Sequence, residues 1–434
     1  MRTVGVALLG LGTVGAGAAR ILLEQRDRIA RRVGLSLELR HVVVRNPEKH
    51  RVSAVPLPLQ TNDLERVCRD PKVEIAVELW GGVSPAREAI LKLLEAGKDI
   101  VTANKALLAE CGPELFDRAH QLGRSIAFEA SVGGGIPIIA ALSESLAANQ
   151  ITSVSGILNG TSNYILTEMT EHGESYATAL SRAQELGFAE LDPSLDVNGT
   201  DAAQKLAILA QLAFGSRVST NQIVRHGIDR LDAADVRYAG ELGYTIKLLA
   251  TAKLTNDSIE LRVARTLVRQ HTPLAEVRGA YNAIRVVGDA VGDTLFYGRG
   301  AGQMPTASAV VADIIDTALG RAQLTFRTLR LWTDPDESAL PIAPPDQIHG
   351  RYYLHFQAED RPGVLAQITR VLGEHDISIA SVIQHEADEN HAAAAVPLVI
   401  MSHNAVEAKM QNAVQEIDSL QCVRPPSVCM RVEG

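Results

Sequence analysis

The sequence has few cysteines, no apolar run of membrane-spanning length and no excess of positive charge. Its four cysteines form neither a CxxC pair nor a metal-ligand spacing with histidine, which favours a reduced, cytoplasmic setting. Because no apolar run reaches the ~20 residues that a membrane helix needs, no membrane association is expected. The net charge is −9, with acidic and basic residues interspersed, so no nucleic-acid partner is expected.

What the chain does contain is a large apolar fraction and an early glycine-rich turn. A length of 434 residues with 46% hydrophobic content predicts two or three domains with sizeable cores. Residues 1–10 superficially resemble a signal peptide. They lead directly into the glycine turn, however, and are better interpreted as a first strand.

The glycine turn has the GxGxxG spacing, at Gly10, Gly12 and Gly15. It stands between an apolar strand expected at 4–9 and a helix expected at 14–31. In a βαβ unit these glycines permit the tight turn, the close approach of a pyrophosphate and the packing of helix on strand. The context predicts a dinucleotide-binding domain, and the alternative is a tight turn that binds nothing.

Basic residues follow the second strand, which is expected at 36–44. Arg45 stands where an NAD-specific site usually has an acidic residue for the ribose 2′-hydroxyl, and Lys49 and Arg51 lie nearby. A 2′-phosphate would be attracted here, so NADP(H) is favoured, with NAD(H) also considered. A solvated basic turn is the alternative interpretation.

The alternation of strands and helices continues, with strands expected at 73–79, 99–102 and 125–128. Ligands bind at the carboxyl ends of the strands in an open parallel sheet. Lys105 follows the strand at 99–102, which suggests a cation on the cofactor or substrate side. The alternative is a surface lysine at the start of a helix.

Glu129 and three glycines, at 133–135, form a loop after the last of these strands. Backbone carbonyls and one carboxylate suit a hard, weakly bound cation such as Na⁺ or K⁺ better than zinc. A plain hinge between domains explains the same pattern equally well.

The stretch 190–205 carries the strongest signal for chemistry. Its carboxylates are Glu190, Asp192, Asp196 and Asp201. Lys205 follows Asp201 by four residues, so the two side chains share one face of a helix that Thr200 or Asp201 is expected to cap. The helix continues as an apolar segment at 206–214 and is expected to be buried. A lysine paired with Asp201 and facing Glu190 can donate a proton or bind a zwitterion, and a structural ion pair is the alternative.

The last part of the chain indicates a return helix and a separate module. A glycine loop at 297–308 opens a helix that is expected to return to the first domain and present backbone N–H groups to the cofactor. A segment rich in proline, aspartate and alanine at 333–349 indicates a linker. The βαββαβ pattern after it predicts a ferredoxin-like module for ligand sensing or assembly.

Together these residues resemble homoserine dehydrogenases, in the bacterial form with a C-terminal ACT domain. The matching motifs, in the family's order, are residues 10–15, 102–105, 129–137, 156–164, 190–209, 288–292 and 297–302. The resemblance covers essentially the whole chain and implies an α/β protein of three domains. They are a Rossmann-type NAD(P)-binding domain at 1–138 with a return helix at about 303–320, an α+β catalytic and dimerisation domain at 139–330, a linker at 331–349 and a ferredoxin-like ACT domain at 350–434.

The resemblance implies the reversible NAD(P)H-dependent reduction of L-aspartate 4-semialdehyde to L-homoserine, in the biosynthesis of threonine, methionine and isoleucine. Lys205 is the implied proton donor, with Lys105 between cofactor and substrate. The implied substrate contacts are Thr161, Glu190, Asp196 and Asp201. The implied cofactor contacts are Gly10, Gly12, Thr13, Val14, Gly15, Arg45, Thr102, Lys105 and Gly302.

The family also binds a monovalent cation, and its position carries over to Glu129 and the carbonyls of Val132, Gly134 and Ile136. Gly134 departs from the family, where a residue with a Cβ is common. The ACT domain implies L-threonine as an effector and a homodimer or homotetramer. The run from His391 through the alanines 392–395 departs from the expected hairpin and weakens the inference of effector binding more than that of catalysis.

Two other hypotheses compete with this one. A non-catalytic NAD(P)-sensing regulator needs no proton donor, so the Lys205 cluster argues against it. Another semialdehyde or amino-acid dehydrogenase is disfavoured only by the resemblance, since the residues themselves indicate no more than a small polar zwitterion.

Overall fold

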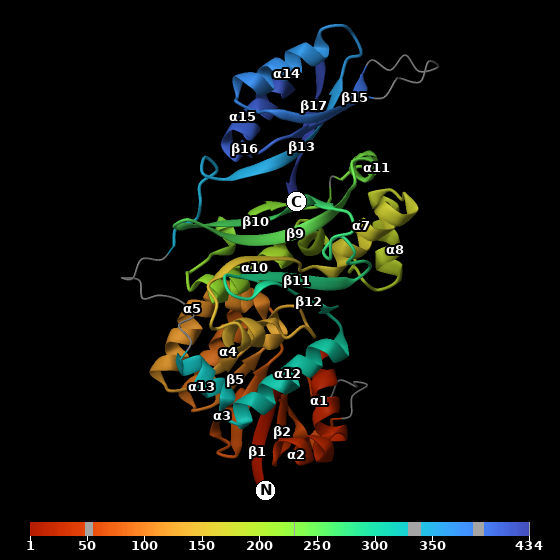
Figure 1. The fold of residues 1–434 in the computed structure, drawn as a ribbon. Coiled ribbons are helices and arrows are strands. Elements are labelled where there is room, and N and C mark those ends of the chain that lie inside the picture. Colours follow the sequence, from red (N-terminus) through yellow and green to blue (C-terminus); the bar gives the residue numbers. More distant parts are fainter. Residues whose placement is uncertain (48–54, 230, 329–339, 385–394, 434) are drawn as a thin grey trace. The chain divides into compact units, whose positions relative to one another are not determined.

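The structure, a computed structural model, describes residues 1–47, 55–229, 231–328, 340–384 and 395–433 (Figure 1). The chain forms two compact units. The N-terminal unit comprises Met1–Gly160, Asp201–Ile223 and Ala280–Leu340, and the C-terminal unit comprises Thr161–Thr200, Val224–Gly279 and Pro341–Gly434. None of the described helices is both long and apolar enough to span a membrane.

A parallel sheet lies at the centre of the N-terminal unit, with six strands in the order β3-β2-β1-β4-β5-β6. The strands are β1 (Arg2–Leu9), β2 (Leu35–Val43), β3 (Gln60–Thr61), β4 (Val73–Glu78), β5 (Asp99–Thr102) and β6 (Ile126–Ala127). Each neighbouring pair is parallel, and this is the strand order of a dinucleotide-binding Rossmann fold. The order reverses between β1 and β4, whose carboxyl ends border the ligand crevice in such folds. The predicted fold of this region is confirmed.

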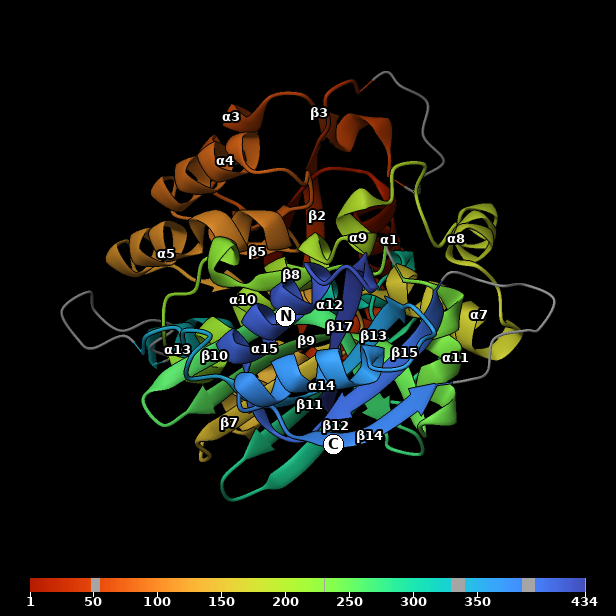
Figure 2. The same ribbon diagram turned by 90° about the horizontal axis from the view of Figure 1, so that it is seen from above.

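Helices pack on this sheet. They are α1 (Thr13–Glu24), α2 (Arg26–Val33), α3 (Leu64–Arg69), α4 (Ser84–Glu95), α5 (Lys105–Gln121), α12 (Gln303–Ala318) and α13 (Arg321–Thr328). Figure 2 shows α4 and α5 side by side, and α12 lies against α1 in Figure 1. Gly17 makes the second contact possible, because a Cβ at this position would lie 2.9 Å from the Ala307 Cβ. The expected return helix is therefore α12.

The single helix expected at 14–31 is two helices. Gln25 has φ −111° and separates α1 from α2. The break lets α2 turn its buried residues, Ile29 and Ala30, into the core of the sheet. Hydrophobic periodicity does not reveal such a break, because both helices bury apolar residues on the same core.

The N-terminal unit also contains an antiparallel set of strands and a buried helix. The strands are β7 (Ile151–Ile157), β11 (Tyr281–Gly288) and β12 (Gly292–Arg299), in the order β12-β11-β7. Helix α10 (Thr200–Phe214) is buried from Asp201 to Gln211 except at Gln204. This burial confirms the prediction from its nearly all-apolar sequence.

The C-terminal unit contains further helices and strands. Its first segments are α7 (Gly160–His172), which begins in the N-terminal unit, α8 (Tyr176–Glu185), α9 (Ser194–Val197), β8 (Val224–His226), α11 (Ala233–Glu241), β9 (Tyr244–Thr255) and β10 (Ser258–Arg269). The last segments are β13 (His349–Ala358), α14 (Val364–Glu374), β14 (Ile379–Gln384), β15 (Val396–Ser402), β16 (Ala405–Val406), α15 (Glu407–Asp418) and β17 (Val423–Glu433). The strand order β17-β13-β15-β14 confirms the predicted ferredoxin-like module.

This module continues the sheet of the C-terminal unit. Strand β17 pairs with β13 on one side and in parallel with residues 266–268 of β10 on the other. The structure describes the predicted linker only from Leu340 onward, and this part is hydrogen-bonded to β10. Ile259 of β10 donates its N–H to Pro341 O and accepts one from Ala343 at its own carbonyl.

Candidate active site

Two lysines share one carboxylate at the start of α10. Asp201 Oδ2 lies 2.7 Å from Lys205 Nζ, and Asp201 Oδ1 lies 3.2 Å from Lys105 Nζ. Asn159 Nδ2 donates to Asp201 Oδ2 at 2.8 Å. Asp201 and Lys205 are buried, whereas the Lys105 side chain is 38% exposed. All of these residues lie in the N-terminal unit.

The Lys205 ammonium has three N–H groups, of which the structure accounts for two. Its Nζ donates to Asp201 Oδ2 and, at 2.7 Å, to the Leu158 carbonyl oxygen. One N–H therefore remains for a ligand. A group held in this way by two fixed acceptors is suited to deliver a proton in a defined direction.

The Asp201 side chain is a stable carboxylate anion. Burial would raise the pKa of this carboxyl, but the charges of Lys205 and Lys105 and the hydrogen bonds from Lys205 and Asn159 lower the pKa to about 2. The carboxylate is ionised at neutral pH and offsets the charge of two lysine side chains.

Local structure explains how these side chains reach one another. Lys105 is the first residue of α5, whose N-cap is Asn104, since Asn104 Oδ1 accepts the N–H of Leu107 at 3.2 Å. The expectation that Thr200 or Asp201 caps α10 is wrong. The helix begins at Thr200 and its first N–H is bound by Asn198 Oδ1, at 2.9 Å, which leaves the Asp201 carboxylate to the lysines.

Sequence reasoning did not identify Asn159 or Asn104. The signal for Asn104 is its place immediately before a predicted helix, where asparagine is a favoured N-cap. Asn159 lies just after β7 in a segment rich in hydrogen-bonding side chains, and nothing in its spacing relates it to Asp201.

Three other predicted substrate contacts, Thr161, Glu190 and Asp196, belong to the C-terminal unit. Thr161 is buried, and its hydroxyl donates to the Phe188 carbonyl oxygen at 2.7 Å. Glu190 is exposed. The carbonyl oxygen of Asp196 accepts a hydrogen bond from the Ser162 hydroxyl at 3.0 Å. The structure thus brings Lys105, Asp201 and Lys205 together in one unit and places these three residues in the other.

The glycine turn has room for a pyrophosphate. Gly10 has φ +113°, and a Cβ there would lie 2.8 Å from the Leu79 carbonyl oxygen. A Cβ at Gly15 would lie 2.2 Å from the Gly10 oxygen, whereas one at Gly12 would meet nothing within 4 Å. Gly12 is the N-cap of α1, which then runs through Thr13 and Val14. An open, glycine-capped helix start fits a dinucleotide phosphate.

The other predicted cofactor contacts lie in different surroundings. Arg45 is exposed just after β2, while Lys49 and Arg51 lie outside the described residues. Gly302, with φ +119°, is the N-cap of α12. Thr102 is fully buried, and its hydroxyl donates to Glu78 Oε2 at 2.7 Å. In this structure the Thr102 side chain is bound to another buried side chain of the protein interior, so a direct contact with the cofactor stays a prediction.

The Glu129 carboxylate lies against a helix start. Its Oε1 and Oε2 each accept a backbone N–H at 2.9 Å, from Ile139 and Ala140 of α6 (Ile138–Ala140). Burial raises the pKa of Glu129, and also that of Asp313, which accepts the Glu129 N–H at 2.9 Å. No cluster of three or more His, Cys, Asp or Glu side chains that could hold a metal is found in the part of the chain that the structure describes.

The glycine loop after Glu129 is closely packed. Gly134 has φ +55°, and a Cβ would lie 2.6 Å from the Gly300 oxygen, which explains glycine here. Ile136 O accepts the Ile138 N–H at 2.8 Å, and the Val132 residue is fully buried. Carbonyl oxygens of this kind can still coordinate a monovalent cation, since each has a second lone pair.

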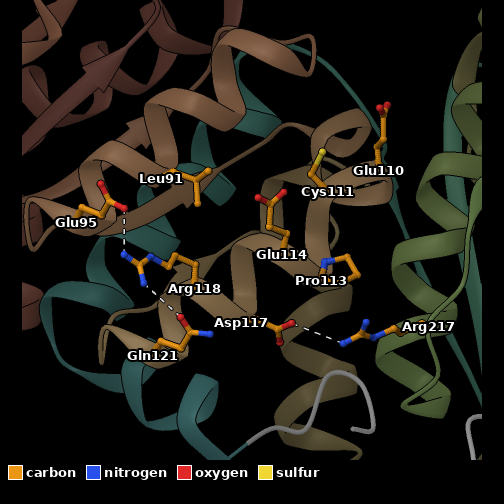
Figure 3. Close-up of a pocket in the computed structure, with 10 residues that line it drawn as sticks. All are labelled: Leu91, Glu95, Glu110, Cys111, Pro113, Glu114, Asp117, Arg118, Gln121 and Arg217. Atoms are coloured by element: carbon orange, nitrogen blue, oxygen red, sulfur yellow. Dashed lines mark hydrogen bonds and ion pairs between the residues drawn. The ribbon is translucent and has the colours of Figure 1, made fainter. Parts of the chain in front are cut away.

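A hollow of about 680 Å³ in the N-terminal unit lies along the middle and end of α5. Lys105, in contrast, is the first residue of this helix. Figure 3 shows two ion pairs among its lining side chains, Arg118 with Glu95 at 3.0 Å and Arg217 with Asp117 at 3.6 Å, whereas Glu110 points away from them. Glu114 is paired with Arg87, which lies outside this lining. Most of the charged side chains in the lining therefore already have a partner, and the hollow offers less to a substrate than the Asp201 cluster.

A Rossmann sheet with an open glycine turn, together with a buried lysine–carboxylate cluster, is typical of a nicotinamide-nucleotide-dependent oxidoreductase. Family models agree. The model for homoserine dehydrogenase matches residues 137–315, that for the homoserine dehydrogenase NAD-binding domain matches 10–129, and that for the ACT domain matches 352–421.

Known proteins give the same answer. A homoserine dehydrogenase of Neisseria gonorrhoeae is 46% identical over 436 residues, which span 100% of this chain and 99% of the relative. The crystal structure of a homoserine dehydrogenase from Thiobacillus denitrificans has a TM-score of 0.92 at 43% identity, covering 100% of this chain and 99% of that one. A hyperthermophilic archaeal homoserine dehydrogenase, solved in complex with NADPH, has a TM-score of 0.61 at 26% identity and covers 73% and 98%.

The chain therefore belongs to the homoserine dehydrogenase family, whose members are NAD(P)-dependent oxidoreductases acting on a CH–OH group. The family resemblance predicted from the sequence motifs is confirmed.

Proposed function

We propose that this chain catalyses the reversible NADPH-dependent reduction of L-aspartate 4-semialdehyde to L-homoserine, in the pathway to threonine, methionine and isoleucine. The observation that carries the proposal is the Asp201 carboxylate, held between Lys205 and Lys105. The reaction needs a proton donor at the aldehyde oxygen, and this cluster supplies one.

When bound, the nicotinamide cofactor supplies the hydride that reduces the aldehyde carbon. Lys205 donates a proton to the oxygen on which negative charge develops, using the N–H that Asp201 and Leu158 leave available. Asp201 holds this ammonium in place. Lys105, more exposed and bound to the other oxygen of Asp201, adds a second positive charge next to the developing alkoxide.

Residues of the C-terminal unit contribute recognition of the substrate. Exposed Glu190 suits the substrate ammonium, and half-buried Asp196 of α9 adds a second carboxylate later in the same segment of the chain. Thr161, whose hydroxyl donates to the Phe188 carbonyl oxygen, is also a proposed substrate contact. The two carboxylates suit the ammonium group of a small amino-acid aldehyde.

NADP(H) is the proposed cofactor, with NAD(H) as the weaker alternative. Exposed Arg45, just after β2, is available to a 2′-phosphate. An archaeal relative was solved with NADPH, which agrees with this choice. The cofactor contacts are Gly10, Gly12, Thr13, Val14, Gly15 and Gly302.

We also propose a Na⁺ or K⁺ site at Glu129 and the carbonyls of Val132, Gly134 and Ile136. The closely packed glycine loop supports it, since a fixed loop holds carbonyl oxygens in place for a hard cation.

L-Threonine is the proposed effector of the ACT domain. A hollow of about 390 Å³ lies at the turn Asp360–Gly363 and includes Glu359, Arg361 and Gln384. These charged and polar side chains suit an amino acid. Of the run at 391–395, residues 391–394 lie outside the described residues.

A homodimer or homotetramer in the cytoplasm is the proposed form. Strand β12 is the edge strand of its sheet, and its Leu295 and Tyr297 side chains are exposed. This apolar edge is available to pair with a second copy of the chain. The proposed domains are 1–138 with α12, 139–330 and 350–434.

The test is NADPH consumption by the full chain with L-aspartate 4-semialdehyde, followed by loss of reduced-nicotinamide absorbance, with homoserine detected as product. A small aldehyde without the amino-acid groups, such as butanal, is the control substrate. Rapid consumption only with the semialdehyde supports the proposal, and no consumption with NADPH bound contradicts it. Inhibition by L-threonine, but not by L-alanine, supports the proposed regulation, and equal rates with and without threonine contradict it.

A further inference from the structure

A buried carboxylate outside the lysine cluster, Glu78, lies at the carboxyl end of β4 and is 1% exposed. Its neighbours in the two adjacent parallel strands are Leu9 of β1 and Thr102 of β5. The first of these strands leads into the glycine turn, and the second leads to Lys105. Glu78 therefore stands between the cofactor loop and the helix that carries one of the two active-site lysines.

Glu78 accepts hydrogen bonds from neutral groups on both sides. Its Oε1 accepts the backbone N–H of Trp80 at 2.8 Å and of Gly81 at 3.3 Å. Its Oε2 accepts the Thr102 hydroxyl at 2.7 Å. Gly81 and Gly82 have φ values of +75° and +74°, which side chains other than glycine rarely adopt. The loop after β4 is thus bent back onto the Glu78 carboxylate.

These bonds continue into a closed ring. The Thr102 hydroxyl accepts the Asn104 N–H at 3.1 Å, and Asn104 Nδ2 donates to the Gly82 carbonyl oxygen at 2.7 Å. Gly82 belongs to the loop that Glu78 holds. Asn104 is also the N-cap of α5, so the ring fixes the point at which Lys105 leaves the sheet.

The same loop touches the glycine turn. A Cβ at Gly10 would lie 3.1 Å from Trp80 Cδ1, so the Trp80 ring packs directly on this turn. One hydrogen-bonded ring therefore joins the segment that packs on the cofactor turn to the segment that carries Lys105.

We propose that Glu78 is a positioning residue for the dehydrogenase reaction. Its carboxylate sets the start of α5, and thereby Lys105, relative to the glycine turn. Lys105 depends on this support, because its side chain is partly exposed and its one ion pair in the described residues, with Asp201, is 3.2 Å long. The inference rests on the proposed roles of Lys105 and the glycine turn, since only then does their spacing affect the reaction.

The first variant is Glu78→Gln, which keeps the shape and one oxygen for the Trp80 and Gly81 N–H groups. Its amide NH₂ cannot accept the Thr102 hydroxyl proton, so the bond from this hydroxyl to the Glu78 carboxylate is lost. Because small displacements at a reacting centre can cost ~10²-fold, we expect kcat to fall by about 10-fold to 100-fold. We expect the KM for the semialdehyde to change less than kcat.

A matched pair at Thr102 tests the same bond from its other end. Thr102→Ser keeps the hydroxyl and is expected to lose far less kcat than Thr102→Val, which removes the hydroxyl and should reproduce the loss seen in Glu78→Gln. Thermal unfolding shows whether each variant is folded. If Glu78→Gln does not fold, the contrast between the serine and valine variants decides the question, and equal kcat values for them would overturn the proposal.

A double-mutant cycle with Lys105→Met separates positioning from a general structural role. If Glu78 acts through Lys105, Glu78→Gln should lower kcat much less in the Lys105→Met background than in the wild type. Losses that simply multiply would overturn the proposal while leaving the proposed function intact. A wild type that does not reduce the semialdehyde would instead overturn the proposed function, and this inference with it.

Discussion

Lys205 and Lys247 are two buried lysines with different partners, 8% and 2% exposed. Lys205, in the N-terminal unit, has an ionised carboxylate at 2.7 Å in Asp201. Lys247, in β9 of the C-terminal unit, donates to the Val277 carbonyl oxygen at 2.5 Å and to Asn163 Oδ1 at 3.3 Å. Among the described residues Lys247 has no ion pair within 4.0 Å.

The difference shows that burial alone does not make a lysine an acid for catalysis. Burial, with the nearby charge of Arg278, lowers the pKa of Lys247 to about 8, so its charge is a cost to the folded state. Asp201 offsets the charge of Lys205 and fixes its direction, while a third N–H is left for a ligand. The proposed role is therefore structural for Lys247 and chemical for Lys205.

The largest effect on stability is expected from Asp201→Asn. This change leaves buried Lys205 without a counter-charge, and breaking one side of a buried pair typically costs ~3–5 kcal/mol of unfolding free energy. Urea unfolding of the wild type and the variant at neutral pH measures this loss of unfolding free energy. Lys105→Met is the control, since it removes the exposed partner of the same carboxylate and should cost much less; equal losses would contradict the account.

A smaller effect, with a defined pH dependence, is expected from Lys247→Met. The folded-state pKa of Lys247 is about 8, below its ordinary 10.5, so between these values the unfolded chain binds a proton that the folded chain has lost. Stability of the wild type should therefore rise with pH across this window relative to the variant, by about 1–3 kcal/mol. Below pH 8 Lys247 is protonated in both the folded and the unfolded state, and the folded state bears the full cost of the buried charge.

Urea unfolding of both proteins at pH 7.5 and pH 10 checks the sign of this effect. The difference between the two proteins isolates Lys247 from other groups that titrate at high pH. A difference that is independent of pH would show that Lys247 is not forced toward its neutral form by burial.

The third prediction extends the comparison to an exposed cation, Arg45. Because Arg45 is exposed, we expect it to contribute to the binding of a charged ligand and not to the stability of the fold. We expect Arg45→Ala to raise the KM for NADPH by about tenfold, as lost charge-assisted hydrogen bonds of ~1.5 kcal/mol would do, and that for NADH much less. Initial rates with each cofactor measure the ratio. Equal increases would show that Arg45 does not bind the 2′-phosphate.

Local patterns in the sequence predicted much of this architecture. The glycine turn within a βαβ unit predicted the Rossmann sheet, and the spacing of Asp201 and Lys205 by one helical turn predicted their ion pair. The βαββαβ order predicted the C-terminal module. Each of these features depends on residues close together in the chain, where helix and strand periodicity apply.

Contacts between distant segments could not be predicted in this way. Asp201 binds Lys105 and Asn159 because the ends of β5 and β7 meet the start of α10, and no spacing in the sequence encodes that meeting. The pairing of β17 with β10 likewise depends on which strand edge is available after folding. The requirement for glycine at position 134 comes from the Gly300 oxygen, which lies far along the chain.

The most direct test of the account compares kcat for Lys205→Met and Lys247→Met, with L-aspartate 4-semialdehyde and NADPH at saturation. Both variants replace a buried ammonium by a similar apolar chain. We predict that Lys205→Met loses about 10²–10⁴-fold in kcat while still binding NADPH, as expected for a lost proton donor, and that Lys247→Met stays close to the wild type. Near-wild-type turnover by Lys205→Met, or equal losses in both variants, would contradict it.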